Sequence, residues 1–92
     1  MKKLTIVRFK PKPECFIEFV EALKEHSRER HSAHYIMTRE DEVLAVVIRD
    51  AGKLEESAKD GVSWLDQQRH LLQEFNDVDK HTIFMTGDLV DN

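Results

Sequence analysis

Hydrophobic positions follow a strand-like pattern at the start of the chain and a helix-like pattern directly after it. The segment 4–10, LTIVRFK, is rich in β-branched and aromatic residues, which are typical of strands. Pro11 and Pro13 end this strand, because proline has no N–H group to donate to a strand ladder. From Cys15 onward, with charged residues opposite, the apolar side chains recur on one helix face: Phe16, Phe19, Val20 and Leu23. The pattern predicts a strand followed by an amphipathic helix.

The rest of the chain repeats this alternation of strand and helix patterns. A tight turn is expected around Asp41, between two β-branched runs. Segment 53–75 predicts a helix, in which Gly61 is a candidate break because glycine weakens a helix interior. Strands are predicted at 34–39 (HYIMTR), 43–49 (VLAVVIR) and 81–87 (HTIFMTG).

The order of elements is therefore β-α-β-β-α-β, within one domain that spans residues 1–92. Two split βαβ units predict an α+β, ferredoxin-like fold. In such a fold a four-stranded antiparallel sheet carries both helices on one face, and right-handed crossovers favour this arrangement.

The segment 43–49 is apolar on both of its faces, which a sheet covered by helices on one side only does not require. A sheet with one wet face should alternate apolar and polar residues, but this strand reads Val43, Leu44, Ala45, Val46, Val47 and Ile48. An exposed apolar face of this size exceeds what monomers normally tolerate. We therefore expect a homodimer that forms through the sheet faces.

Composition excludes several partners and compartments. The net charge of −4 argues against a nucleic-acid-binding protein, and no apolar stretch approaches membrane-spanning length. The single cysteine, Cys15, cannot form an internal disulfide, and the N-terminus lacks the apolar core of a signal peptide. These features predict a cytoplasmic protein with no nucleic-acid or membrane partner, in which Cys15 is a small core residue.

Several motifs together carry a resemblance to a known family. The opening LTIVRFKPKPECFIEFVEAL, the strand VLAVVIRD, and a tryptophan, Trp64, in the second helix before a final FMTG strand resemble the dimeric α/β-barrel superfamily. Within it, the chain is most similar to the antibiotic-biosynthesis monooxygenase-like (ABM) domain. The resemblance covers nearly the whole chain and implies a dimer whose two sheets face each other in a barrel, with the helices outside.

Enzymes of this superfamily include cofactor-independent quinone-forming monooxygenases and haem-degrading monooxygenases. The resemblance implies a working trio: an asparagine on the first strand, the helical tryptophan, and a later histidine or tyrosine. Trp64 matches this trio, whereas segment 4–10 holds no asparagine. The nearest candidate for the histidine is His70. Residues six positions apart on a helix differ by about 240°, so we expect Trp64 to face the core or a cavity and His70 to face solvent.

Gln68 and Arg8 are weak candidates for ligand binding, in addition to Trp64. Gln68 lies one turn after Trp64 near the middle of the apolar stripe, where it would either hold a ligand or make a structural hydrogen bond. Arg8 and Arg39 should approach the same end of the sheet, where each would receive an anion or, as we favour, pair with an acidic residue of the turn.

Three histidines cluster in the segment HSRERHSAH: His26, His31 and His34. They straddle a predicted helix end and a loop, and arginines separate them, so we expect a solvated segment rather than a metal site. The sequence thus predicts no metal and no cofactor.

Two classes of function stay open. One is a cofactor-independent monooxygenase-like enzyme that acts on a small apolar or aromatic substrate in a cavity on the barrel side of the sheet. The other is a non-catalytic homodimer that binds a small apolar ligand or serves as a structural module. The catalytic residues stay unassigned.

Overall fold

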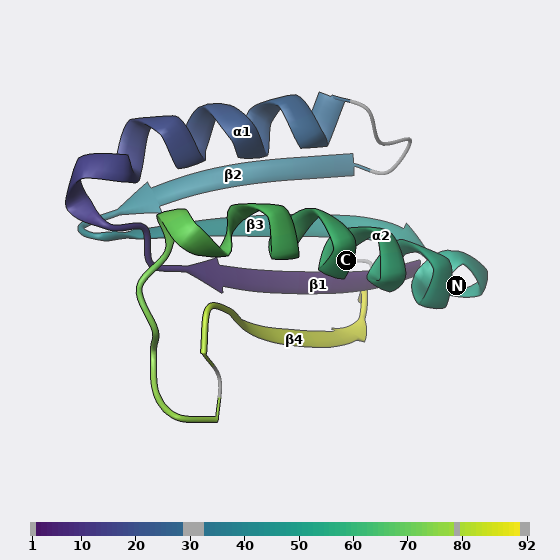
Figure 1. The fold of residues 1–92 in the computed structure, drawn as a ribbon. Helices are drawn as coiled ribbons and strands as arrows, with labels where there is room; N and C mark the ends of the chain where they lie inside the picture. Colours follow the sequence, from purple (N-terminus) through teal and green to yellow (C-terminus); the bar gives the residue numbers. More distant parts are fainter. Residues whose placement is uncertain (1, 29–32, 79, 91–92) are drawn as a thin grey trace.

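The computed structural model describes residues 2–28, 33–78 and 80–90, and its elements follow the predicted order (Figure 1). The strands are β1 (Lys2–Phe9), β2 (Ala33–Arg39), β3 (Glu42–Asp50) and β4 (Ile83–Asp88). The helices are α1 (Phe16–Arg28) and α2 (Leu54–Gln68), with short 3₁₀ turns η1 (Pro13–Cys15), η2 (Ala51–Lys53) and η3 (Arg69–Leu71).

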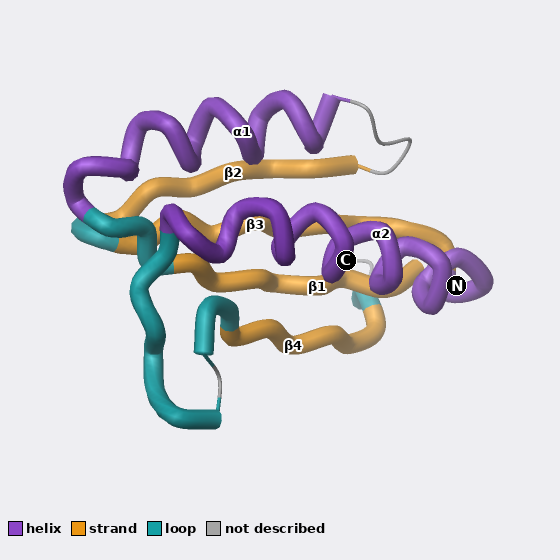
Figure 2. Tube along the Cα trace, in the orientation of Figure 1, coloured by secondary structure: helices purple, strands orange, loops and turns teal. Residues whose placement is uncertain are grey.

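The strands form a four-stranded antiparallel sheet in the order β2-β3-β1-β4. Both helices lie over one face of it, α1 along β2 and α2 along β3 and β1 (Figure 2). Aromatic contacts tie both helices to β1, because the ring of Phe9 lies 5.0 Å from that of Phe19 on α1 and 6.2 Å from that of Trp64 on α2. The predicted α+β fold is confirmed at this level, and its arrangement is compatible with a ferredoxin-like fold.

The structure resolves the open question at Gly61 in the second helix and corrects the predicted end of that helix. The helix runs through Gly61 without a break. Its end was predicted wrongly at Phe75, since the α-helix stops at Gln68 and η3 follows. Leu72 is extended and bridges to Pro11, and two backbone hydrogen bonds (Lys12 N to Leu71 O, 2.8 Å; Gln73 N to Lys10 O, 2.7 Å) hold this segment beside the end of β1. These contacts satisfy backbone groups that a longer helix would have paired internally.

The two faces of the sheet differ in how they are covered. Directly paired residues of an antiparallel sheet share a face, so the register separates the side chains into two sets. One set, which we call the helix-covered face, packs against α1 and α2 and includes Phe9, Val43 and Ala45, which are at most 5% exposed. Cys15 packs against this core as expected.

The opposite side, which we call the open face, carries apolar residues that nothing in the described chain covers. Tyr35, Met37 and Met85 are 61%, 49% and 63% exposed there. The remaining large apolar members of this face are half-buried: Leu4, Ile6, Leu44, Val46, Ile48 and Ile83. The central strands are thus apolar on both faces, as the sequence predicts. In the described residues, no helix has the length and apolar character needed to cross a bilayer.

Candidate functional site

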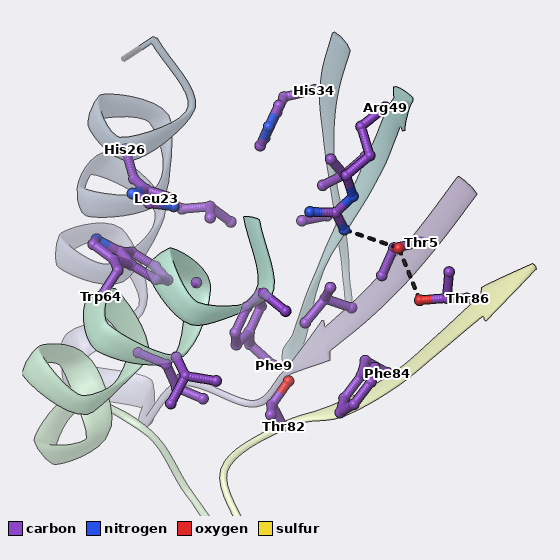
Figure 3. A pocket seen from close by; sticks show the side chains of 17 residues that line it. Thr5, Phe9, Leu23, His26, His34, Arg49, Trp64, Thr82, Phe84 and Thr86 are labelled. Atoms are coloured by element: carbon purple, nitrogen blue, oxygen red, sulfur yellow. Dashed lines mark hydrogen bonds between the residues drawn. The ribbon is translucent and has the colours of Figure 1, made fainter. Parts of the chain in front are cut away.

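A pocket of about 360 Å³ lies between the helix-covered face of the sheet and the two helices (Figure 3). Its volume lies within the roughly 300–1,000 Å³ typical of small-molecule sites. The floor is made by alternate residues of β1 and β3, and the walls by α1, α2 and β4. The pocket therefore lies on the other side of the sheet from the barrel-side cavity that the sequence led us to expect.

Aromatic side chains form much of the apolar wall. Trp64 lies edge-on to Phe9, with an interplanar angle of 82°, and its ring centroid is 5.8 Å from that of Phe19. Phe84 of β4 borders the pocket and is 68% exposed. Trp64 is accordingly both packed against the core and part of a cavity wall, which confirms the interpretation of this residue from helical geometry.

Three polar side chains, one each from β1, β3 and β4, lie together at one end of the pocket. The Nη2 atom of Arg49 donates a hydrogen bond of 2.9 Å to the hydroxyl of Thr5, and this hydroxyl lies 2.9 Å from that of Thr86. The register explains their proximity, because Thr5 pairs directly with Thr86 and stands diagonal to Arg49 on the same face. Thr5 is buried, at 3% exposed. We call Thr5, Arg49 and Thr86 the polar end of the pocket.

Two histidines also line the pocket, which corrects the prediction that their segment is solvated. His26 lies in the last turn of α1 and stacks on Trp64, with ring centroids 4.7 Å apart and 18° between the planes. His34 is on β2, where it pairs with Val47 of the helix-covered face, and its ring points into the pocket (Figure 3). His31 lies outside the described residues.

The prediction failed because it treated the histidines as one charged run. His26 follows Leu23 by three residues and so shares the inner face of α1. The two-residue period of β2 places His34 on the helix-covered face. Within the described chain, no group of three or more histidine, cysteine or acidic residues is placed to hold a metal ion.

Of the weak candidates from the sequence, only Trp64 borders the pocket. Gln68 is half-buried at the end of α2 and is not among the residues that line the pocket. Arg8 points to the open face, where it forms an ion pair of 2.8 Å with Glu42 and lies over the ring of Phe75. The favoured pairing of Arg8 with an acidic residue next to the turn is thereby confirmed.

The orientation of His70 is also as predicted. His70 is exposed in η3, while Trp64 faces inward from α2. The α-helix continues unbroken from Trp64 to Gln68, so the argument from helical rotation applies to that part of the separation, and His70 follows in the 3₁₀ turn η3. The structure does not bring them together as a pair.

The pocket combines apolar walls with a few polar and titratable side chains. Among the described residues that line it, Arg49 is charged, His26 and His34 are titratable, and none carries a carboxylate. Such a site can bind an apolar molecule and can orient it by an oxygen atom that accepts hydrogen bonds. The sequence did contain a signal for this group, since Thr5, His34 and Arg49 are polar residues at inward-facing positions of otherwise apolar strands.

Comparison of the chain with models of protein families, with curated proteins and with solved structures finds no match in any of the three.

Proposed function

We propose that this protein binds a small aromatic molecule in the pocket between the sheet and the helices. The observation that carries the proposal is a cavity of about 360 Å³ walled by Phe9, Trp64 and Phe84 and polar at one end. A purely structural module would be expected to fill its interior with side chains, because protein interiors are normally close-packed. A cavity of this size in a chain of 92 residues therefore favours a binding function.

Binding is tested with 1-naphthol by isothermal titration calorimetry. Ala45 is buried in the pocket floor and Ala58 is an exposed residue of α2 that lines the pocket, so Ala45→Phe and Ala58→Phe should each weaken binding by tenfold or more. Ser63→Phe is the matched control, because Ser63 is exposed on the same helix and does not line the pocket. Equal binding by all variants would contradict the proposal.

We further propose that the activity is that of a cofactor-independent monooxygenase, as the resemblance to the ABM domain implies. In such a reaction O₂ oxidises a phenol to a quinone, one oxygen atom enters the product, and the other leaves as water with two substrate hydrogens. The step begins when a base removes the phenolic proton. His34 and His26 are the described residues of the pocket that can accept it.

The enzymatic proposal is tested by measuring oxygen uptake with 1-naphthol, which should yield one 1,4-naphthoquinone and one water for each O₂ consumed. His34→Ala should lower the rate while 1-naphthol binding persists. Binding of 1-naphthol without oxygen uptake would favour the alternative, a non-catalytic protein that holds a small ligand.

We also propose that two copies associate through the open face, in the cytoplasm. The support is the number of apolar side chains on that face, from Leu4 and Ile6 of β1 to Met85 of β4. An isologous contact between two copies would cover this face, and each protomer would keep its own pocket on the far side of the sheet.

A further inference from the structure

Three threonine hydroxyls line the pocket in the described part of the chain, and two of them have acceptors within the protein. The Thr82 hydroxyl donates to the backbone oxygen of Arg8 at 3.0 Å. The side chain of Thr5 is buried, and its partners among the described residues are Arg49 and Thr86. Because a guanidinium only donates, the hydrogen of the Thr5 hydroxyl goes to Thr86 at 2.9 Å. The Thr86 hydroxyl therefore accepts from Thr5 and keeps its own hydrogen for a different acceptor.

Thr86 presents this hydrogen beside the aromatic mouth of the pocket. Alternate residues of a strand share a face and lie about 6–7 Å apart, so Thr86 and Phe84 of β4 lie next to each other along the pocket wall (Figure 3). Phe84 is 68% exposed, and Val62 on the facing helix α2 is 54% exposed, although both line the pocket. The pocket thus opens to solvent between α2 and β4, with the Thr86 hydroxyl at this opening.

A ligand that fills the pocket removes solvent from this hydroxyl. Thr86 is exposed in the ligand-free protein, so solvent can accept its hydrogen. A wholly apolar ligand would leave the hydrogen without an acceptor, which costs the desolvation of that group. A ligand with an acceptor oxygen at this point replaces the lost hydrogen bond. The pocket should therefore discriminate between aromatic molecules by the presence of such an oxygen.

We propose that Thr86 determines the specificity of the pocket by donating a hydrogen bond to an oxygen on the ring of an aromatic ligand, or one atom away from it. This inference rests on the proposed ligand-binding function of the pocket. The short distance between Thr86 and Phe84 sets the position of the oxygen, because a ring packed against Phe84 brings only a nearby oxygen within hydrogen-bonding distance of the hydroxyl. An aryl carbonyl group and a phenol both have such an oxygen.

The test compares 1-indanone with indane, which has the same two-ring skeleton without the carbonyl oxygen, by isothermal titration calorimetry. Thr86→Val should weaken 1-indanone binding by about threefold to tenfold, the value of a neutral hydrogen bond. The same variant should not weaken indane binding, because valine has no hydrogen that loses its acceptor, and this result also shows that the variant is folded. Thr86→Ser keeps the hydroxyl and should bind 1-indanone as the wild-type protein does.

Thr82→Val is the matched control. Thr82 lines the same pocket, but its hydroxyl hydrogen goes to the backbone of Arg8, so the affinity for 1-indanone relative to indane should stay unchanged. A third probe, 4-indanol, has the same skeleton with a phenol oxygen. Whichever of 4-indanol and 1-indanone loses more affinity in Thr86→Val has the oxygen that the site prefers.

Two results would overturn the role of Thr86. Equal weakening of 1-indanone and indane by Thr86→Val would mean that this residue only shapes the pocket. An unchanged affinity of this variant for both 1-indanone and 4-indanol would mean that the ligand oxygen binds elsewhere. If none of the probes binds to the wild-type protein, the proposed function itself fails, and the inference about Thr86 fails with it.

Discussion

Thr5 is the residue that ties the polar end of the pocket to the sheet. It is a buried polar residue in the middle of β1, and both of its side-chain partners come from other strands, Arg49 on β3 and Thr86 on β4. Thr5→Val keeps the side-chain shape and removes the hydroxyl. We expect the free energy of unfolding to fall by about 1–3 kcal/mol, because the partners lose a hydrogen bond at a buried site.

Thr86→Val is the matched control for this stability prediction. Thr86 is exposed, so water can replace its hydroxyl, and we expect a loss below about 1 kcal/mol. Urea denaturation of the ligand-free proteins measures both changes. If the two variants lost equal stability, the buried hydroxyl of Thr5 would contribute no more than the exposed hydroxyl of Thr86, and the prediction would be contradicted.

The residues of the site differ in how far the sequence could place them. Helical rotation led to the correct prediction that Trp64 faces inward and His70 outward, although His70 lies in the 3₁₀ turn η3 beyond the end of α2. His26, His34 and Arg49 were missed because the face on which a polar side chain lies depends on where a helix or strand begins and on its register, and a one-residue shift reverses a strand. The many charged residues around the histidines favoured the prediction that the segment is exposed to solvent. In the structure, the packing of α1 against α2 places His26 against Trp64 instead.

At the scale of elements, α2 contains a residue that favours a helix poorly and that also lines the pocket. Gly61 lies in its interior, and a Cβ atom built there would meet nothing within 4 Å. Gly61→Ala should therefore raise the free energy of unfolding by about 0.5–1 kcal/mol, since alanine restricts the unfolded chain and favours the helix. Thermal unfolding followed by circular dichroism measures the gain. A loss of stability would mean that the helix does not run continuously through this position.

The same helix shows where prediction from sequence reaches its limit. The apolar spacing that continues to Phe75 favours a helix, yet the chain leaves the helix at Gln68 and becomes extended at Leu72. The cause is a set of contacts with Lys10, Pro11 and Lys12, about sixty residues earlier in the chain. Local periodicity contains no information about a partner so distant in sequence, whereas the four-stranded antiparallel sheet with both helices on one face followed from general rules of connection.

At the scale of the whole molecule, the sheet separates the pocket on its helix-covered face from the apolar residues of its open face. Neighbouring residues of β3 point in opposite directions, so Val47 belongs to the helix-covered face and Val46 to the open face. Val47 is 7% exposed within one chain, and Val46 is half-buried. Adjacent substitutions on one strand can therefore test folding and association independently.

We expect Val46→Asp to abolish dimerisation and leave the monomer folded. A carboxylate on the open face can stay hydrated in the separate chain, but it would be desolvated against a second sheet. Sedimentation at low micromolar concentration should give twice the 10.8 kDa chain mass for the wild-type protein and the single chain mass for the variant. Val47→Asp places the same charge in the packed interior, where it should cost several kcal/mol and unfold the chain. If Val46→Asp sedimented as a dimer, the copies would associate through another surface, and a wild-type monomer would exclude the barrel arrangement altogether.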